Sequence, residues 1–298
     1  MTVEKWENFS SVLSEIFGNT LFVKLYLRQN PPDFGLQAGK YQIPSGTIEE
    51  IIEALKKPMN ESDENITFLE GWNIYDIDKT LVSKWLISSW EFVDFVTSCE
   101  NFCPLKANYG FISDVETLEG FLYPDTYAIN PANFTIEGLV RKMLSNFQVK
   151  VIDSGILADM GSIEMLDIIN MASIVQKEAN KRDNPEEIAL IAGILKKRAK
   201  EWWQIGADAT VCYPFKIATQ DCGPDEVLTY LYDKNEYNTR QMVGLPAWPI
   251  ANPEADIIKA TVESKDSPYY YYLHDTTGKI HYGVSNADHE ANKQKYLY

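Results

Sequence analysis

The chain has 298 residues, of which 45% are hydrophobic and 23% are charged, a mixture typical of globular proteins. Its formal net charge is −16, which argues against a general electrostatic attraction to nucleic acid or to an anionic membrane surface. This length favours one large domain or two modest ones.

The sequence shows neither a membrane-spanning segment nor a signal peptide. Its uncharged apolar runs fall well short of the roughly 18 residues that cross a bilayer. The N-terminal residues include Glu4, Lys5, Glu7 and Glu15, and such charges are foreign to a signal peptide.

The front of the chain, residues 1–105, reads as short αβ pieces. Thr2-Val3 could start a strand, and a helix is expected at 10–16. A strand pattern bounded by glycine at 35–43 precedes a helix at 48–57. Thr47 and Glu50 form the capping-box pattern at the start of that helix.

A second αβ unit follows the first. Residues 65–69 are rich in β-branched side chains, which favours a strand. Glu70-Gly71-Trp72 reads as a turn, and 74–85 as a helix. The order strand, glycine turn, helix thus occurs twice, as a weak internal repeat.

The four cysteines leave their chemistry open. Cys99 and Cys103, and likewise Cys212 and Cys222, have spacings that match no common zinc pattern, and the chain has only three histidines. Free thiols and one or two disulfides are both possible. We expect no metal and no cofactor.

The middle of the chain combines an aromatic segment with helices. Residues 118–127 (LEGFLYPDTY) suit a loop or short strand, and 135–151 predict a helix. Ser162 is a candidate N-cap, and the apolar residues from 165 to 175 cover nearly every face of the helix that follows, so this helix is expected to be buried.

The last third begins with a further helix and then becomes rich in loops. Asn184, Pro185 and Glu187 predict a capped helix start, with the helix running to about Trp203. A short helix at 257–262 and a hairpin around Asp275-Thr276-Thr277-Gly278 end the chain. These elements predict an α+β fold.

Glu178 closes the buried helix in the stretch MASIVQKEAN (171–180). Apolar neighbours raise the pKa of a carboxyl group because burial disfavours its charged form. A carboxyl group protonated near neutral pH can act as a general acid toward a glycosidic oxygen. The alternative is an ordinary helix-end acid that is hydrated or paired with Lys181 or Arg182.

Further candidates have equally plausible structural explanations. The aromatic segment offers sugar-binding side chains or core packing, Asp208 could simply form a turn or a cap, and the loops at 237–239 and 244–253 could bind ligand or only make turns. The candidate side chains are Glu119, Tyr123, Asp125, Tyr127, Asp208, Tyr237, Asn238 and Asn252.

Together these motifs resemble the endolytic murein transglycosylases, the MltG or YceG-like family. The resemblance is carried by ordered blocks, and a final hairpin with His281, Asp288 and His289 continues it. The blocks are LEGFLYPDTY (118–127), MASIVQKEAN (171–180), ILKKRAKEWWQIGADATVCY (194–213) and YNTRQMVGLPAWPIANP (237–253). Residues 35–55 and 66–81 resemble the LysM-like region of the family.

The resemblance implies a lyase that cuts the β-1,4 bond between N-acetylmuramic acid and N-acetylglucosamine within nascent peptidoglycan strands and leaves a 1,6-anhydromuramoyl end. It implies Glu178 as the single catalytic residue, and substrate binding or support of Glu178 for the other candidates. Glu178 matches the second Glu of the family's ASIVEKE block, Gln176 stands where that block has its first Glu, and Ala207 and Ala209 replace the usual Gln and Pro of the family.

The resemblance also implies two domains, a LysM-like region at 1–105 and a catalytic domain at 106–298. Family members carry an N-terminal membrane helix, so we expect a single-pass membrane protein whose catalytic part lies on the extracytoplasmic face, with its anchor missing from this chain. Peptidoglycan strands are the expected partner, together with cell-wall synthases.

Two other functions fit the same residues. The departures at Ala207 and Ala209 favour a non-catalytic peptidoglycan-binding or scaffold protein of the same fold. A muramidase that uses Glu178 together with Asp208 or Glu119 would instead give hydrolytic products, because hydrolysis of a glycoside usually needs two carboxyl groups.

Overall fold

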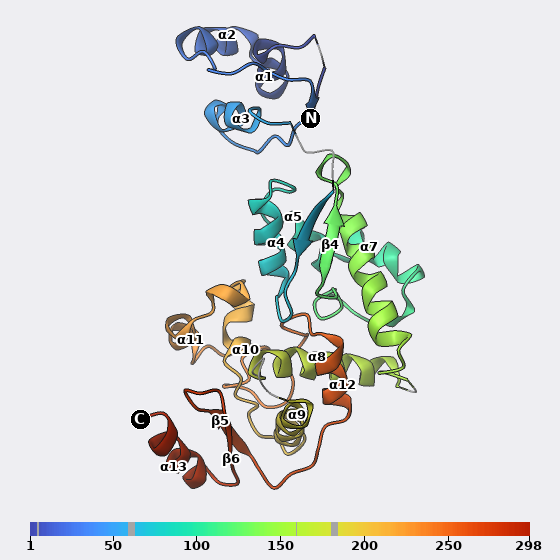
Figure 1. Cartoon of the computed structure of the whole chain (residues 1–298), viewed down its shortest axis with the longest axis vertical. Helices are drawn as coiled ribbons and strands as arrows, with labels where there is room; N and C mark the ends of the chain where they lie inside the picture. The colour runs from blue at the N-terminus through green and yellow to red at the C-terminus, as the bar shows by residue number, and fades with distance from the viewer. Residues whose placement is uncertain (5, 59–62, 159, 180–183) are drawn as a thin grey trace.

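The computed structural model describes residues 1–4, 6–58, 63–158, 160–179 and 184–298. The elements follow one another along the long axis in three groups (Figure 1). We call them the first lobe (1–58), the second lobe (63–158) and the third lobe (160–298). Helices alternate with small two-stranded antiparallel sheets, so the mixed helix-and-sheet class expected from the sequence is confirmed.

The first lobe is a small unit with a core of its own, built around Val12, Leu13 and Ile51. Its elements are β1 (Thr2–Val3), α1 (Phe9–Phe17), α2 (Thr20–Gln29), β2 (Gly39–Lys40) and α3 (Ile48–Ala54). The capping box predicted at Thr47 and Glu50 is present at the start of α3. β2 pairs with β1, so this short strand belongs to the sheet of the first lobe.

In the second lobe, as in the first, helices stand between two paired strands. Its ordered elements are β3 (Glu64–Thr67), α4 (Ile74–Ser83), α5 (Glu91–Thr97), α6 (Cys99–Phe102), η1 (Cys103–Ala107), η2 (Gly110–Ile112), β4 (Thr126–Ile129), η3 (Pro131–Asn133), α7 (Ile136–Phe147) and η4 (Gln148–Ile152). β3 pairs with β4, with Thr67 opposite Thr126. This ladder joins residues on the two sides of the domain boundary that we placed after residue 105.

The third lobe consists of packed helices and the C-terminal hairpin. Its elements are α8 (Ser162–Glu178), α9 (Pro185–Lys200), α10 (Ala209–Cys212), η5 (Tyr213–Phe215), η6 (Thr219–Asp221), α11 (Pro224–Tyr230), α12 (Ala255–Val262), β5 (Tyr271–His274), β6 (Ile280–Gly283) and α13 (Asn286–Tyr296). The predicted hairpin is confirmed by the antiparallel pairing of β5 with β6. A single hydrophobic core runs from Ile66 in the second lobe to Ile280 in the third.

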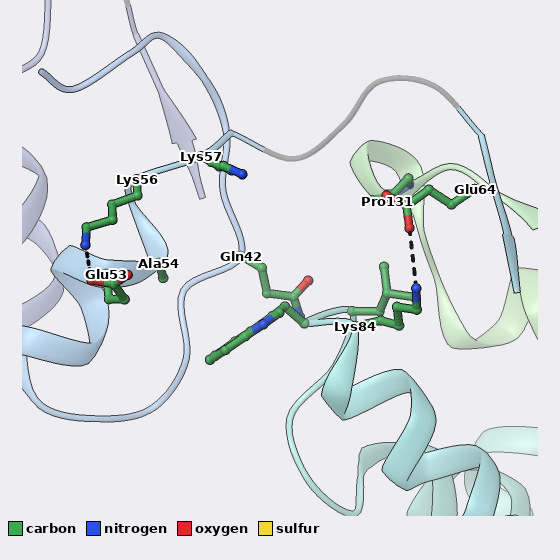
Figure 2. Close-up of a pocket in the computed structure, with 10 residues that line it drawn as sticks. Gln42, Glu53, Ala54, Lys56, Lys57, Glu64, Lys84 and Pro131 are labelled. Atoms are coloured by element: carbon green, nitrogen blue, oxygen red, sulfur yellow. Dashed lines mark ion pairs between the residues drawn. The ribbon is translucent and has the colours of Figure 1, made fainter. Parts of the chain in front are cut away.

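A crevice separates α3 of the first lobe from the second lobe (Figure 2). Lys56 pairs with Glu53 on one side, and Lys84 lies 4.0 Å from Glu64 on the other. Trp85 lines the crevice as well. Its lining residues come from α3 and from the part of the second lobe next to α3, and in Figure 1 α3 and α8 lie at opposite ends of the second lobe.

All four cysteines are paired in two disulfides, Cys99 with Cys103 and Cys212 with Cys222. The first disulfide braces the short helices that follow α5. The second links α10 to the residue that follows η6, next to the candidate site. Within the residues that the structure describes, no helix is both long and apolar enough to span a bilayer.

Candidate functional site

Glu178 is the last residue of α8, whose second half is buried in the core of the third lobe. The buried residues of α8 run without a break from Ile168 to Val175, which confirms the burial predicted from its apolar pattern. The N-cap is Gly161, and Ser162, which we expected to be the N-cap, is the first helical residue, so the helix begins one residue earlier than expected. A buried helix body and a polar end place the Glu178 carboxyl where the core meets solvent.

The proline-containing loop at 244–253 fixes α8 from one side. Asn170 donates its side-chain N–H to the carbonyl of Pro246 at 2.7 Å, and the Ser173 hydroxyl accepts the N–H of Ile250 at 3.1 Å. These buried polar contacts tie the loop to the helix that carries Glu178, because each buried polar group needs its partner.

Gln176, the departure from the family pattern, has a structural role. Its side-chain oxygen accepts the N–H of Glu254 at 2.9 Å, at the N-cap of α12. A glutamate could accept the same bond, so the change from Glu to Gln preserves this contact.

Two cavities open beside Glu178, and the carboxyl group lines both of them. Cavity A, of about 330 Å³, is lined by Glu178 together with Asn73, Lys177, Asp208, Tyr213 and the Cys212–Cys222 disulfide. Cavity B, of about 530 Å³, is lined by Glu178 together with Arg198, Trp203, Arg240, Tyr272 and His289. Volumes of this size are typical of ligand sites.

The Glu178 carboxyl is held by one hydrogen bond from the hairpin. The Tyr272 hydroxyl on β5 donates to Glu178 Oε2 at 2.7 Å. Burial is the main reason that the pKa of Glu178 lies above its ordinary value, and the Tyr272 hydrogen bond partly offsets this shift. Asp208 raises the pKa of Glu178 further, whereas Arg240 and Arg198 lower it. A raised pKa suits a general acid.

Asp208 is positioned by hydrogen bonds between its own segment, residues 206–210, and Thr239. Gly206 donates its backbone N–H to the carbonyl of Thr239, and the Thr210 and Thr239 hydroxyls lie 2.8 Å apart. This pairing places Asp208 beside Arg240, whose Nε donates to Asp208 Oδ1 at 2.5 Å. Asp208 therefore enters the site as half of an ion pair.

Glu119 lies fully buried behind Tyr213. Its Oε2 accepts the N–H of Ile74 at 2.9 Å, and its Oε1 accepts the side-chain N–H of Asn252 at 2.7 Å. Burial raises the pKa of Glu119 to about 8, even though these bonds and the Tyr213 hydroxyl act in the opposite direction. Glu119 thus holds the second lobe against the third.

Asn252 satisfies all of its hydrogen-bonding groups inside the protein. Its side-chain oxygen accepts the backbone N–H groups of Gly120 and Leu122, and its amide nitrogen donates to Glu119 and to the carbonyl of Trp72. The LEGFLYPDTY segment therefore docks on the loop at 244–253 through Asn252.

The aromatic segment forms a cluster separate from Glu178. The Tyr127 hydroxyl donates to the carbonyl of Tyr123 at 2.7 Å. Asp125 pairs with Lys150 at 2.8 Å, which lowers the pKa of Asp125. The Lys150 ammonium also lies 4.8 Å from the Tyr123 ring centre.

Asn238 is buried and holds its own loop in shape, because its side-chain amide donates to the carbonyls of Leu231 and Asp233. The neighbouring Tyr237 ring packs on Tyr213 with centroids 5.0 Å apart. Tyr237 therefore supports a ring that lines cavity A without lining that cavity itself.

Of the sequence candidates, Asp208 is the one that shares a cavity lining with Glu178 in the described part of the chain. Lys181 and Arg182, the alternative partners of Glu178, lie outside the described residues. The sequence reasoning missed Tyr272, Arg198 and Arg240. Their local patterns, a strand of tyrosines and single arginines in a helix and a loop, carry no signal of a shared site.

We expect Tyr272→Phe to move the alkaline limb of the pH–activity profile to higher pH. The Tyr272 hydrogen bond favours the charged carboxylate, so its loss raises the pKa of Glu178 further. The acid form, and the activity that depends on it, would then persist to higher pH. Profiles of kcat/KM against pH for the two proteins measure this shift, and a limb that stays in place or moves to lower pH would contradict it.

The YceG-like family model matches residues 2–295, so the chain belongs to the YceG-like family. The match covers all three lobes.

Curated relatives share one name. A Bacillus subtilis (strain 168) protein named endolytic murein transglycosylase is 26% identical over 275 residues, which cover 88% of this chain and 74% of the relative. A protein of the same name from Streptococcus pneumoniae serotype 2 is 26% identical over 182 residues, covering 60% of this chain and 32% of the relative. The match thus takes in about a third of the pneumococcal protein.

A crystal structure of a protein described as yceG-like, from Listeria monocytogenes, superposes with a TM-score of 0.67. The sequences are 21% identical, and the alignment covers 98% of each chain. At this identity the likeness shows a shared fold along nearly the whole length.

Proposed function

We propose that the protein is an endolytic lytic transglycosylase of peptidoglycan. It would cut the β-1,4 bond between N-acetylmuramic acid and N-acetylglucosamine within nascent glycan strands, with Glu178 as the one catalytic carboxyl group. The shared name of the curated relatives supports the substrate.

The proposed reaction uses Glu178 twice. As an acid, Glu178 gives its proton to the glycosidic oxygen, which leaves as the 4-hydroxyl of N-acetylglucosamine when its bond to C1 breaks. As a base, the carboxylate then takes the proton from the muramoyl 6-hydroxyl while that oxygen bonds to C1. The product is a 1,6-anhydro ring, no water is consumed, and Glu178 ends protonated, ready for the next cycle.

The observation that carries this proposal is the position of Glu178 between cavities A and B. A carboxyl group that must reach a bond inside a strand needs space for sugars on both sides of itself. The raised pKa of Glu178 favours the acid form.

The other carboxyl groups fit a muramidase poorly. Asp208 is occupied by Arg240, and Glu119 is fully buried behind Tyr213. A hydrolase needs a second carboxyl group on the far side of the sugar, to act on water or on C1. Because Asp208, the other carboxyl group in the lining of cavity A, is paired with Arg240, the site favours intramolecular attack by the sugar.

The experiment that tests the proposal is the digestion of purified glycan strands. We expect the full chain to shorten long strands from within, seen by chromatography as a falling strand length with few disaccharides released at early times. A non-catalytic scaffold would bind the strands and leave their length unchanged, and that result would reject the enzyme.

Three further parts of the account stay predictions. The first is the LysM-like nature of the front, which is supported by the order of strand, helices and strand in each of the first two lobes, together with the division after residue 105, which the β3–β4 ladder crosses. An extracytoplasmic, membrane-anchored location rests on the family resemblance. So does association with cell-wall synthases.

A further inference from the structure

We propose that cavity B is a subsite for a carboxylate carried by the muramoyl residue of the substrate, bound by Arg198 and Arg240. This inference rests on the proposed function, since it names the chemical group that one side of the same site would recognise. The muramoyl residue can offer such a carboxylate in two ways, on its lactyl group or on a peptide attached to it.

The charge of the side chains that line cavity B is opposite in sign to the net charge of the whole chain. The protein has a net charge of −16, yet the charged side chains that line cavity B in the described residues are Arg198, Arg240 and Glu178. When Glu178 holds its proton, the lining is cationic. A cationic pocket in an acidic protein selects for an anionic group at that place, while the surroundings repel other anions.

The Arg198 guanidinium is held by two hydrogen bonds that leave its second terminal nitrogen available. Its Nε donates to the carbonyl of Tyr270 at 2.7 Å and its Nη1 to the carbonyl of Ile205 at 2.6 Å. The guanidinium also lies 5.3 Å from the Tyr271 ring centre. A guanidinium group has five N–H donors, and among the residues that the structure describes no group accepts from Nη2, so both of its N–H groups can serve a ligand.

Arg240 completes the site from the opposite segment. It gives its Nε–H to Asp208, and within the described part of the chain its terminal nitrogens donate to no other group. Terminal guanidinium nitrogens are well suited to carboxylates, which they bind through charge-assisted hydrogen bonds.

The remaining walls suit a sugar ring beside the carboxylate. Trp203 is partly exposed and lines cavity B, and His289 stacks on Tyr271 with ring centroids 5.1 Å apart. Aromatic faces pack against the apolar face of a pyranose. Cavity B would thus hold the muramoyl residue and cavity A the N-acetylglucosamine whose oxygen leaves, which sets the direction of the strand across Glu178.

The test measures binding to the full chain carrying Glu178→Gln, so that no probe is turned over. The probes are a muramoyl oligosaccharide without peptide, the same oligosaccharide with its stem peptides, and an oligosaccharide of N-acetylglucosamine alone. Asp208→Asn/Arg240→Met removes the ion pair without changing the net charge. We expect it to weaken binding of a muramoyl probe about ten- to hundredfold, and binding of the N-acetylglucosamine probe much less, because Asp208 also lines cavity A.

Arg141→Met is the matched control. Arg141 pairs with Glu137 at 2.8 Å with 39% of its side chain exposed, against 38% for Arg240, but it lies on α7 away from both cavities. This variant should leave all three affinities unchanged.

The two sources of the carboxylate give different results. Weaker binding of the peptide-free probe assigns the lactyl group, and a loss confined to the peptide-bearing probe assigns the peptide. An equal loss for all three probes, or no loss for any, would overturn the carboxylate subsite. The proposed function is tested separately by the digestion of glycan strands, and it fails if the wild-type chain leaves the strands uncut.

Discussion

Glu178→Gln abolishes strand cleavage and leaves the fold intact. Glutamine has nearly the same shape, and its side-chain oxygen can still accept the Tyr272 hydroxyl. It has no proton to give at neutral pH and cannot take one from the 6-hydroxyl. General acid–base catalysis is worth about 10²–10⁴-fold for one group, and here the same group serves both steps, so we expect a loss at the upper end of that range.

The control is Glu164→Gln in the first turn of the same helix. Glu164 is exposed and lies at the other end of α8, so this change should leave the cleavage rate within about twofold of wild type, as is usual for surface sites. Initial rates of strand shortening compare the variants, and circular dichroism checks their folding. If Glu178→Gln cut strands as fast as Glu164→Gln, Glu178 would have no catalytic role.

We expect Glu119→Gln to destabilise the folded protein, because the amide nitrogen of the new glutamine would face an N–H donor where Glu119 has an oxygen. Both oxygens of Glu119 accept N–H groups, from Ile74 and from Asn252. The Asn252 amide cannot turn over, since its oxygen already accepts two backbone N–H groups. A protonated carboxyl group keeps an acceptor lone pair on each oxygen, whereas an amide nitrogen has none. We expect a loss of about 1–3 kcal/mol in the free energy of unfolding.

The size of this loss should depend on pH. The pKa of Glu119 is raised from 4.5 to about 8 in the folded protein, so the folded state holds a proton that the unfolded state releases. Its contribution to stability is full below pH 4.5 and declines as the pH rises toward 8. The advantage of wild type over Glu119→Gln should therefore shrink between these limits.

Denaturant titrations of wild type, Glu119→Gln and the exposed control Glu116→Gln, each between pH 5 and 8, measure this dependence. The control should show no such trend. A gap between wild type and Glu119→Gln that widens with rising pH would mean that Glu119 is charged when the protein is folded.

Local patterns were enough to predict the frame of the site. The uninterrupted apolar stretch of α8, the capping box at Asn184 and Glu187, and the hairpin at Asp275 all occur as expected. Each of them depends on neighbours a few residues apart, so short-range chemistry determines them. For the same reason the end of the buried helix could be located, and Glu178 with it.

Contacts between distant segments could not be predicted in this way. Tyr272 meets Glu178 from 94 residues away, and Asn252 meets Glu119 across 133. The sequence showed carboxylate and amide groups in aromatic or proline-containing segments, which fits ligand binding as well as a buried hydrogen bond. Only packing of the second lobe against the third decides that Glu119 and Asn252 bind each other.

The most direct test of the central claim is the mass of the new glycan ends made by the full chain in water enriched in oxygen-18. We expect ends lighter than a reducing sugar by one water molecule, with no heavy oxygen, because the muramoyl 6-hydroxyl of the substrate closes the ring. Reducing ends that carry the heavy oxygen would show that water attacks the sugar, and would contradict a single-carboxyl transglycosylase built on Glu178.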